Sequence, residues 1–96
     1  MIVTISARAQ SDLEAIGDYI ARDNPKRAVS FVRELRKKCL DLSALPHGFP
    51  IVPQYETLGI RKRTHGNYLI FYHVDTDRIT VLHIVNGAMD YSDRLL

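Results

Sequence analysis

The residues best suited to chemistry on a nucleic acid are cations, a histidine and a tyrosine in the second half of the chain. Metal-free RNA cleavage needs a base for the 2′-hydroxyl proton, cations for the scissile phosphate and an acid for the leaving oxygen. The residues of these types are Arg61, Lys62, Arg63, His83 and Tyr91. No spacing in the sequence forces them together, so they are a pool of candidates and not a defined site.

Two of these cations, Arg61 and Arg63, lie two residues apart in a predicted strand. Alternate residues of a strand share one face, so the two guanidinium groups could bind phosphates or carboxylates together. An edge strand that its charges protect from aggregation explains the same pattern. We predict Arg61 and Arg63 as target-binding residues and keep the edge strand as the alternative.

Signatures of other chemistry are missing from the sequence. There is no Gly-rich phosphate loop, no Cys cluster, no His-x-x-x-His and no Gly-x-Ser-x-Gly. The four histidines fall in a predicted loop, a turn and two strands, so shared metal ligation would depend on strand register. We therefore expect no metal site and no cofactor.

The composition suits one small core. The chain has 96 residues, 46% of them hydrophobic, which is enough for one core and too little for two, so we expect a single domain over residues 1–96. The one cysteine, Cys39, cannot form an internal disulfide, and no secretory signal opens the chain, which favours a cytoplasmic location. No run of about 18 apolar residues occurs, so we expect no membrane span.

Charge is unevenly distributed although the net charge is only +2. Residues 24–66 hold nine basic and three acidic residues, whereas the remainder holds four basic and eight acidic ones. This asymmetry favours an acidic partner, either a nucleic acid or an acidic protein segment. A solvated helix face beside an edge strand would also produce it.

The first half of the sequence predicts a strand and two helices. Residues 2–5 are a β-branched run, and residues 7–22 carry a helical stripe of Ala9, Leu13, Ile16 and Ile20 with Asp12, Glu14 and Asp18 outside it. Asn24 and Pro25 suit the start of a second helix, which we expect to end at Pro46. Its apolar stripe is formed by Ala28, Val32, Leu35, Cys39 and Leu42, flanked by Phe31 and Leu45.

The second half predicts strands. Residues 46–57 are a proline-rich loop, and residues 58–64, 68–74 and 79–85 alternate with the period of strands joined by short turns. The predicted fold is α+β: an N-terminal strand, an antiparallel two-helix hairpin and a small antiparallel sheet of three further strands.

The last two strands are apolar on both alternating sets of residues. A helical hairpin covers one face of so small a sheet, so we expect a second, apolar face that awaits a partner. We assign five residues to that face, with the reservation that a register slip of one residue would exchange them for their neighbours: Tyr68, Ile70, Tyr72, Leu82 and Ile84. Alternatively, the proline-rich loop and the C-terminal tail close this face.

The order and spacing of several fragments resemble the ParE toxins of the RelE/ParE superfamily over nearly the whole chain. The fragments are Leu13-x-x-Ile16-x-x-Tyr19-Ile20, Asn24-Pro25-x-x-Ala28, Leu45-Pro46-x-Gly48, Leu58-Gly59-Ile60-Arg61, Tyr68-x-Ile70-x-Tyr72 and the run from Ile79 to Ile84. The resemblance implies the toxin of a type II toxin–antitoxin system, neutralised by a small ParD-like antitoxin that wraps around it. The five residues above are then the predicted antitoxin-binding residues.

The resemblance also implies two possible targets. Toxins of the ParE kind poison DNA gyrase, whereas those of the RelE kind cut messenger RNA on the ribosome. Many relatives carry His-x-x-Arg-Asp after the last strand, where this chain reads Asn86-Gly87-Ala88-Met89-Asp90. This departure removes candidate catalytic or phosphate-holding groups, which counts against RNA cleavage and also makes the chain an atypical ParE, and gyrase inhibition is the leading prediction. The alternative, a ribosome-dependent endoribonuclease that uses Arg61, His83 and Tyr91, stays open, as does an inactive homologue.

Overall fold

Residues 1–88 are described by the computed structural model, and they contain one sheet and one helical hairpin. The order of strands and helices agrees with the prediction. It is β1 (Ile2–Ile5), α1 (Ala7–Ala21), α2 (Pro25–Leu40), β2 (Arg61–His65), β3 (Tyr68–Val74) and β4 (Arg78–Asn86), with short 3-10 helices at Asp41–Ala44 and Glu56–Leu58.

Side-chain caps fix the start of both helices. The Ser6 hydroxyl accepts the Ala9 N–H at the start of α1, and the Asn24 side chain accepts the Arg27 N–H at the start of α2. The helix α2 ends at Leu40, earlier than expected, because the next four residues tighten into a 3-10 helix before Pro46. Within residues 1–88, no helix is both long and apolar enough to cross a membrane.

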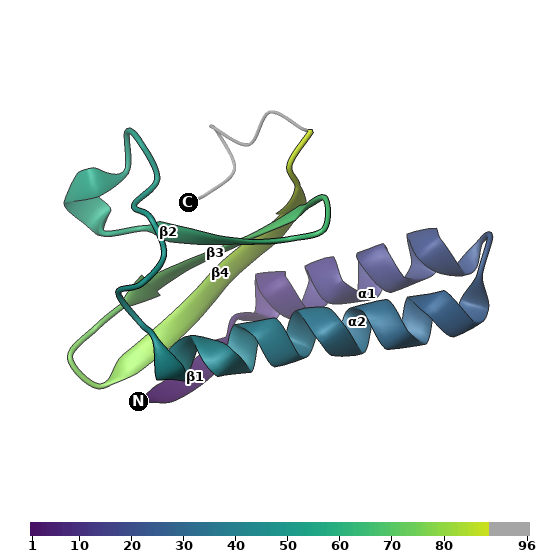
Figure 1. The fold of residues 1–96 in the computed structure, drawn as a ribbon, viewed down its shortest axis with the longest axis horizontal. Helices are drawn as coiled ribbons and strands as arrows, with labels where there is room; N and C mark the ends of the chain where they lie inside the picture. The colour runs from purple at the N-terminus through teal and green to yellow at the C-terminus, as the bar shows by residue number, and fades with distance from the viewer. Residues whose placement is uncertain (89–96) are drawn as a thin grey trace.

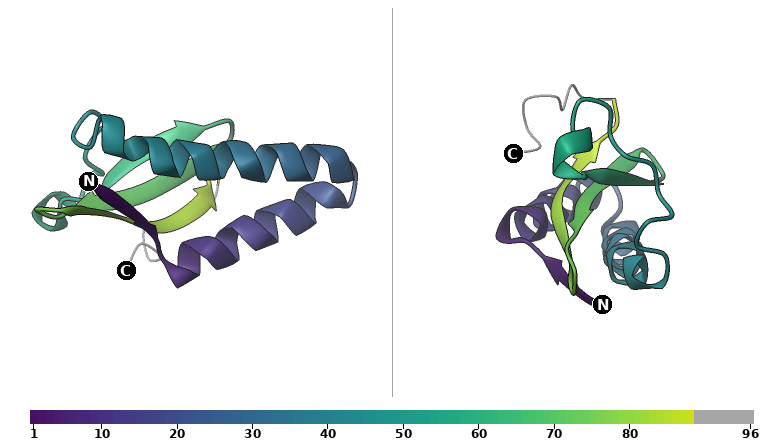
Figure 2. Two further views of the ribbon diagram at one scale, coloured as in Figure 1. Left: turned by 90° about the horizontal axis from the view of Figure 1, so that it is seen from below. Right: turned by 90° about the vertical axis from the view of Figure 1, so that its left-hand side faces the viewer.

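The sheet has the strand order β1-β4-β3-β2. The last three strands pair antiparallel as predicted, and β1 joins the sheet parallel to β4. Figure 1 shows α1 and α2 running side by side and reaching beyond the end of the strands, and Figure 2 shows the same overhang from below.

The hairpin packs on one set of strand residues, which we call the helix face. Ala9, Leu13 and Ile16 of α1 and Leu35, Cys39 and Leu42 around the end of α2 are buried, as the apolar stripes predicted. Leu45, which was predicted to flank the stripe of α2, is 57% exposed and lies outside the core, so that prediction was wrong. On the sheet, the helix face consists of Ile70, Tyr72, Ile79, Val81 and Ile84.

The opposite side of the sheet, which we call the loop face, carries Phe71 and Val85 with Leu69 and Leu82 beside them. The proline-rich loop covers part of it with Val52 and Ile60, and Tyr55 packs against the same cluster. Backbone hydrogen bonds hold the loop in place, from Val52 N–H to the Ile60 carbonyl at 2.8 Å and from Lys62 N–H to the Pro50 carbonyl at 3.1 Å. The alternative prediction, that the proline-rich loop helps to close the second face of the sheet, is therefore confirmed for this loop. The C-terminal tail lies outside the described residues.

A β-bulge in β4 changes which residues face the helices. Phe71 pairs with His83 but Tyr72 pairs with Val81, which leaves Leu82 without a partner across the strand. Val81 and Ile84 consequently both face the helices. The five residues assigned to one uncovered face do not share a face. Ile70, Tyr72 and Ile84 lie under the hairpin, Tyr68 is partly buried against the same cluster, and Leu82 is on the loop face.

Candidate functional site

Beyond the end of β1, polar groups of Ser6 and Asp12 form hydrogen bonds with the backbone of β4 in place of a neighbouring strand. The strand β1 pairs only with Arg78–Val81, whereas β4 continues to Asn86. Ser6, at the junction of β1 and α1, donates its N–H to the Val81 carbonyl and its hydroxyl to the Leu82 carbonyl. Six residues later, Asp12 Oδ2 accepts the Ile84 N–H at 2.8 Å. These polar groups satisfy an edge that would otherwise be open to another chain.

The same Asp12 carboxylate is hydrogen-bonded to the His83 imidazole through Nδ1. The His83 side chain is 8% exposed and that of Asp12 is 18% exposed. The second ring nitrogen, Nε2, is buried without a hydrogen-bond partner among residues 1–88. Because a carboxylate oxygen accepts, Nδ1 is the donor in this hydrogen bond.

A surface depression between α1 and the end of β4 adjoins this pair. It is lined by Asp12, Ala15, Ile16, Tyr19, Tyr68, His83, Ile84, Val85 and Asn86. Burial raises the pKa of the Tyr68 hydroxyl, and the neighbouring Tyr19 hydroxyl raises it further, while a hydrogen bond from Asn86 opposes the shift. The depression thus combines two tyrosines and an amide with an apolar floor, which suits a protein side chain better than a phosphate.

Tyr68 also belongs to an aromatic cluster between α2 and the β2–β3 turn. The ring centroid of Phe31 lies 5.6 Å from that of Tyr68 and 5.4 Å from that of His65. Glu34 accepts hydrogen bonds from Arg27 at 2.6 Å and from His65 at 3.1 Å, and these two contacts lower the pKa of its carboxyl group. This cluster joins the hairpin to the sheet.

Arg61 and Arg63 point to one side of β2, as the sequence predicted, because they pair with Tyr72 and Ile70 of the helix face. Their guanidinium groups hold backbone carbonyls. Arg61 Nη1 donates to His47 at 3.1 Å and to Phe49 at 2.7 Å, and Arg63 Nη1 donates to Lys38 at 3.0 Å. The Arg63 guanidinium also lies 4.8 Å from the Phe49 ring centroid. Both arginines therefore tie the proline-rich loop and the end of α2 to the sheet.

The residues predicted for RNA cleavage are not assembled into one site. Arg61 is on β2 and His83 is on β4, with the whole of β3 between them. His83 is engaged by Asp12 and Arg61 by the loop carbonyls. Tyr91 lies outside the described residues. Across residues 1–88, no group of three or more His, Cys, Asp or Glu side chains is placed to hold a metal ion.

Of the predicted antitoxin-binding residues, Tyr68 and Leu82 are partly exposed. Ile70 and Tyr72 are fully buried and Ile84 is 3% exposed, so a partner reaches them only if the hairpin moves. The role of all five in antitoxin binding stays a prediction. Asp12 was missed as a structural residue, since the sequence shows only that it lies off the apolar stripe and gives no sign of its partner 71 residues away.

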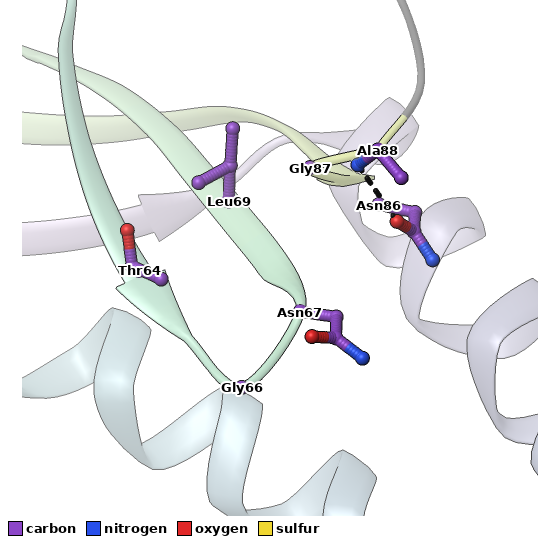
Figure 3. Close-up of a pocket in the computed structure, with 7 residues that line it drawn as sticks. All are labelled: Thr64, Gly66, Asn67, Leu69, Asn86, Gly87 and Ala88. Carbon is purple, nitrogen blue, oxygen red and sulfur yellow. Dashed lines mark hydrogen bonds between the residues drawn. The ribbon is translucent and has the colours of Figure 1, made fainter.

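A second depression opens beside Leu69, where the β2–β3 turn meets the end of β4 (Figure 3). Gly87 N–H donates to the Asn67 carbonyl at 2.7 Å, and Asn86 Oδ1 accepts the Ala88 N–H at 2.9 Å. The lining residues are Thr64, Gly66, Asn67, Leu69, Asn86, Gly87 and Ala88. This end of the sheet therefore has accessible surface on both sides of Asn86.

Residues 3–91 match the family model described as the ParE toxin of the type II toxin–antitoxin system parDE. The chain belongs to the ParE toxin family. The superfamily and branch expected from the sequence are thus confirmed. No curated protein matches the chain.

Two solved structures are similar to this ParE family member. One is described as a chromosomal ParDE system from Pseudomonas aeruginosa, with 22% identity, a TM-score of 0.77, and coverage of 90% of this chain and 95% of that one. The other is described as the toxin–antitoxin complex RelBE2 from Mycobacterium tuberculosis, with 19% identity, a TM-score of 0.66, and coverage of 88% and 95%. At these identities the likeness establishes the fold.

Proposed function

We propose that this ParE family member is neutralised by a cognate ParD-like antitoxin in a hetero-oligomeric complex, and that the released toxin arrests growth by inhibiting DNA gyrase. The family match over residues 3–91 is the observation that supports this proposal most. The two similar structures are described as toxin–antitoxin systems, which supports a protein partner. A chain this small is marginally stable, and a bound partner would add to its stability.

The antitoxin contacts that we propose lie at the end of the sheet around Asn86. Tyr68 borders the depression beside α1, and Leu82 lies on the loop face with Leu69, where both side chains are only partly buried. A segment that crosses this end of the sheet would contact Tyr68 and Leu69, and it would reach Leu82 by continuing along β4 over the loop face. Ile70, Tyr72 and Ile84 would support this surface from beneath and not contact the partner directly.

For target binding we keep Arg61 and Arg63 on the edge strand β2. Each guanidinium uses Nη1 for backbone carbonyls, and Nε and Nη2 form no hydrogen bond within residues 1–88. The unused N–H groups suit a carboxylate or phosphate of the target. The separation of Arg61 from His83 by a whole strand counts against the alternative, RNA cleavage by these residues.

The test is unopposed expression of the chain in bacteria, with growth, plasmid supercoiling and message integrity recorded together. We expect growth arrest with loss of supercoiling and intact messages, and relief by the cognate antitoxin. The variant Arg61→Ala with Arg63→Ala should lose toxicity and still copurify with the antitoxin, whereas the exposed control Arg78→Ala should stay toxic. Rapid loss of translated messages would replace the gyrase assignment with RNA cleavage, and normal growth would overturn the toxin assignment for this chain.

A further inference from the structure

The outer side of the helical hairpin, away from the sheet, carries a groove between α1 and α2. Its floor is apolar, with Leu13 and Gly17 of α1 against Ala28 and Val32 of α2. Val29 lines the α2 wall near the start of that helix and is 60% exposed, although it is a large apolar residue. Figure 1 shows the two helices side by side along this whole length.

The two walls of the groove carry opposite charges. Glu14 and Asp18 stand on the α1 wall, while Arg36 lines the α2 wall and Arg33 follows Val29 by one turn. None of these four side chains takes part in an ion pair within residues 1–88. Arg36 instead donates to the Gln10 amide oxygen at 3.2 Å across one end of the groove. The groove is therefore apolar at its centre and has unpaired charges of both signs at its rim, which is the pattern of a protein–protein interface.

An occupant of this groove needs basic groups against α1 and acidic groups against α2. A second copy of the same hairpin provides both if it is rotated by 180° about an axis along the groove, because that rotation places α1 of one copy over α2 of the other. Positions along the groove are unchanged by this rotation. Gly17 lies beside Val32, and Gln10 beside Arg36, so Glu14 of one copy comes over the segment of the other that holds Arg33 and Arg36. The acidic α1 wall of each copy then faces the basic α2 wall of the other copy, so the same charge pairs form on both sides of the axis.

We propose that two copies of this chain associate through the outer faces of their hairpins, with Val29 at the centre and the Glu14 and Asp18 walls against the Arg33 and Arg36 walls. This interface goes beyond the proposed toxin function and does not depend on it. Two helices of about 22 Å in length, packed about 9 Å apart, present a face about 22 Å long and about 18 Å wide, which is on the order of 400 Å² per copy. That area is small for a specific interface, so the dimer is weak and depends on concentration and salt.

Charge exchange between the two walls tests the proposal with purified full-length chain by analytical ultracentrifugation. One variant carries Glu14→Arg and Asp18→Arg, and the other carries Arg33→Glu and Arg36→Glu. Each alone should be at least tenfold weaker in self-association than the original chain, because both sets of contacts become repulsive. An equimolar mixture should restore a dimer, because both sets are attractive again. The control Asp75→Arg with Asp77→Arg makes the same change of net charge in the exposed β3–β4 turn and should leave the dimer intact.

The self-association of the original chain tests whether the dimer forms, and that of the variants tests whether it forms through these two walls. An original chain that stays monomeric up to about 1 mM overturns the proposal. Variants that dimerise as well as the original chain, or folded variants that fail to associate when mixed, overturn the proposed interface. If a double variant does not fold by circular dichroism, the exposed single change Val29→Arg replaces it. That change should also weaken the dimer at least tenfold, and unchanged association would contradict the account.

Discussion

The Asp12 carboxylate on α1 and the His83 imidazole on β4 are hydrogen-bonded to each other across 71 residues of sequence. The same oxygen of Asp12 accepts the Ile84 N–H, so one carboxylate serves two donors at the place where β1 stops pairing with β4. This contact anchors the middle of α1 to the sheet beside the bulge at Leu82. Its geometry explains why His83 is so deeply buried, and it assigns the pair a structural role.

The variant Asp12→Ala should lose about 2–3 kcal/mol of unfolding free energy, because it leaves the Ile84 N–H and the His83 Nδ1 without an acceptor. The variant Asp12→Asn should lose about half as much, since an amide oxygen still accepts one hydrogen bond. Urea denaturation followed by circular dichroism measures both. The exposed control Asp18→Asn should change stability by less than about 0.5 kcal/mol. Equal stability of Asp12→Ala and the original chain would rule out the anchoring role.

Tyr72 links the sheet to the start of the proline-rich loop through its hydroxyl group, which donates to the Pro46 carbonyl at 3.0 Å. Because its ring is fully buried, Tyr72→Phe should cost about 1–2 kcal/mol through the lost hydrogen bond alone. Tyr72→Asp should prevent folding, since it buries a charge in the core. The exposed Tyr19→Phe serves as the control. A folded Tyr72→Asp variant that fails only in antitoxin binding would return this residue to the interface.

The reactivity of the Cys39 thiol measures how often the core beneath the helical hairpin opens. Burial raises the pKa of its thiol from 9.0 to about 11, so the reactive thiolate is scarce in the folded chain at neutral pH. Labelling with a thiol reagent should therefore be slow, and it should slow further when the antitoxin binds. The raised pKa also means that the neutral thiol stabilises the fold fully below about pH 9, and that this contribution is lost as the pH rises toward 11. Fast labelling of folded chain at pH 7 would contradict this burial.

The ionised carboxyl group of Glu34 stabilises the folded chain, and this stabilisation is lost at acid pH. Hydrogen bonds from Arg27 and then His65 lower the pKa of its carboxyl group below the ordinary value of 4.5. A lowered pKa stabilises the folded chain above about pH 4.5, and the stabilisation is lost as the pH falls through the folded-state pKa. The variant Glu34→Gln should therefore show a smaller loss of stability between pH 6 and about pH 3 than the original chain, by urea denaturation. An unchanged slope would mean that the contact with Arg27 and His65 does not persist in solution.

Local patterns were sufficient for the elements of this fold. The bounds of β1 and β3 agree with their β-branched and aromatic runs, and the stripes around Leu13 and Leu35 are buried as expected. The caps at Ser6 and Asn24 depend only on residues three positions away. Such features depend on neighbours in sequence, so sequence reasoning reaches them.

Features that depend on residues far apart in the sequence could not be predicted from local patterns. The bulge at Leu82 reverses the alternation of β4, and the groups that hold that edge, Ser6 and Asp12, come from the other end of the chain. The bulge therefore explains why Leu82 and Ile84 do not share a face, whereas Ile70 and Tyr72 lie under the hairpin because β3 presents its other set of residues to the loop. Arg61 and Arg63 looked like free cations because nothing in the sequence shows that carbonyls of His47, Phe49 and Lys38 lie beside them.

The proposed action of the released toxin on DNA gyrase is tested by incubating purified, folded toxin with gyrase, ATP and relaxed plasmid. Supercoiling and the formation of linear DNA are scored on gels, with the toxin–antitoxin complex as the matched control. We predict that free toxin blocks supercoiling or raises linear DNA, and that the complex does neither. No effect from folded toxin that arrests growth in cells would contradict the account and direct the search to messenger RNA on the ribosome.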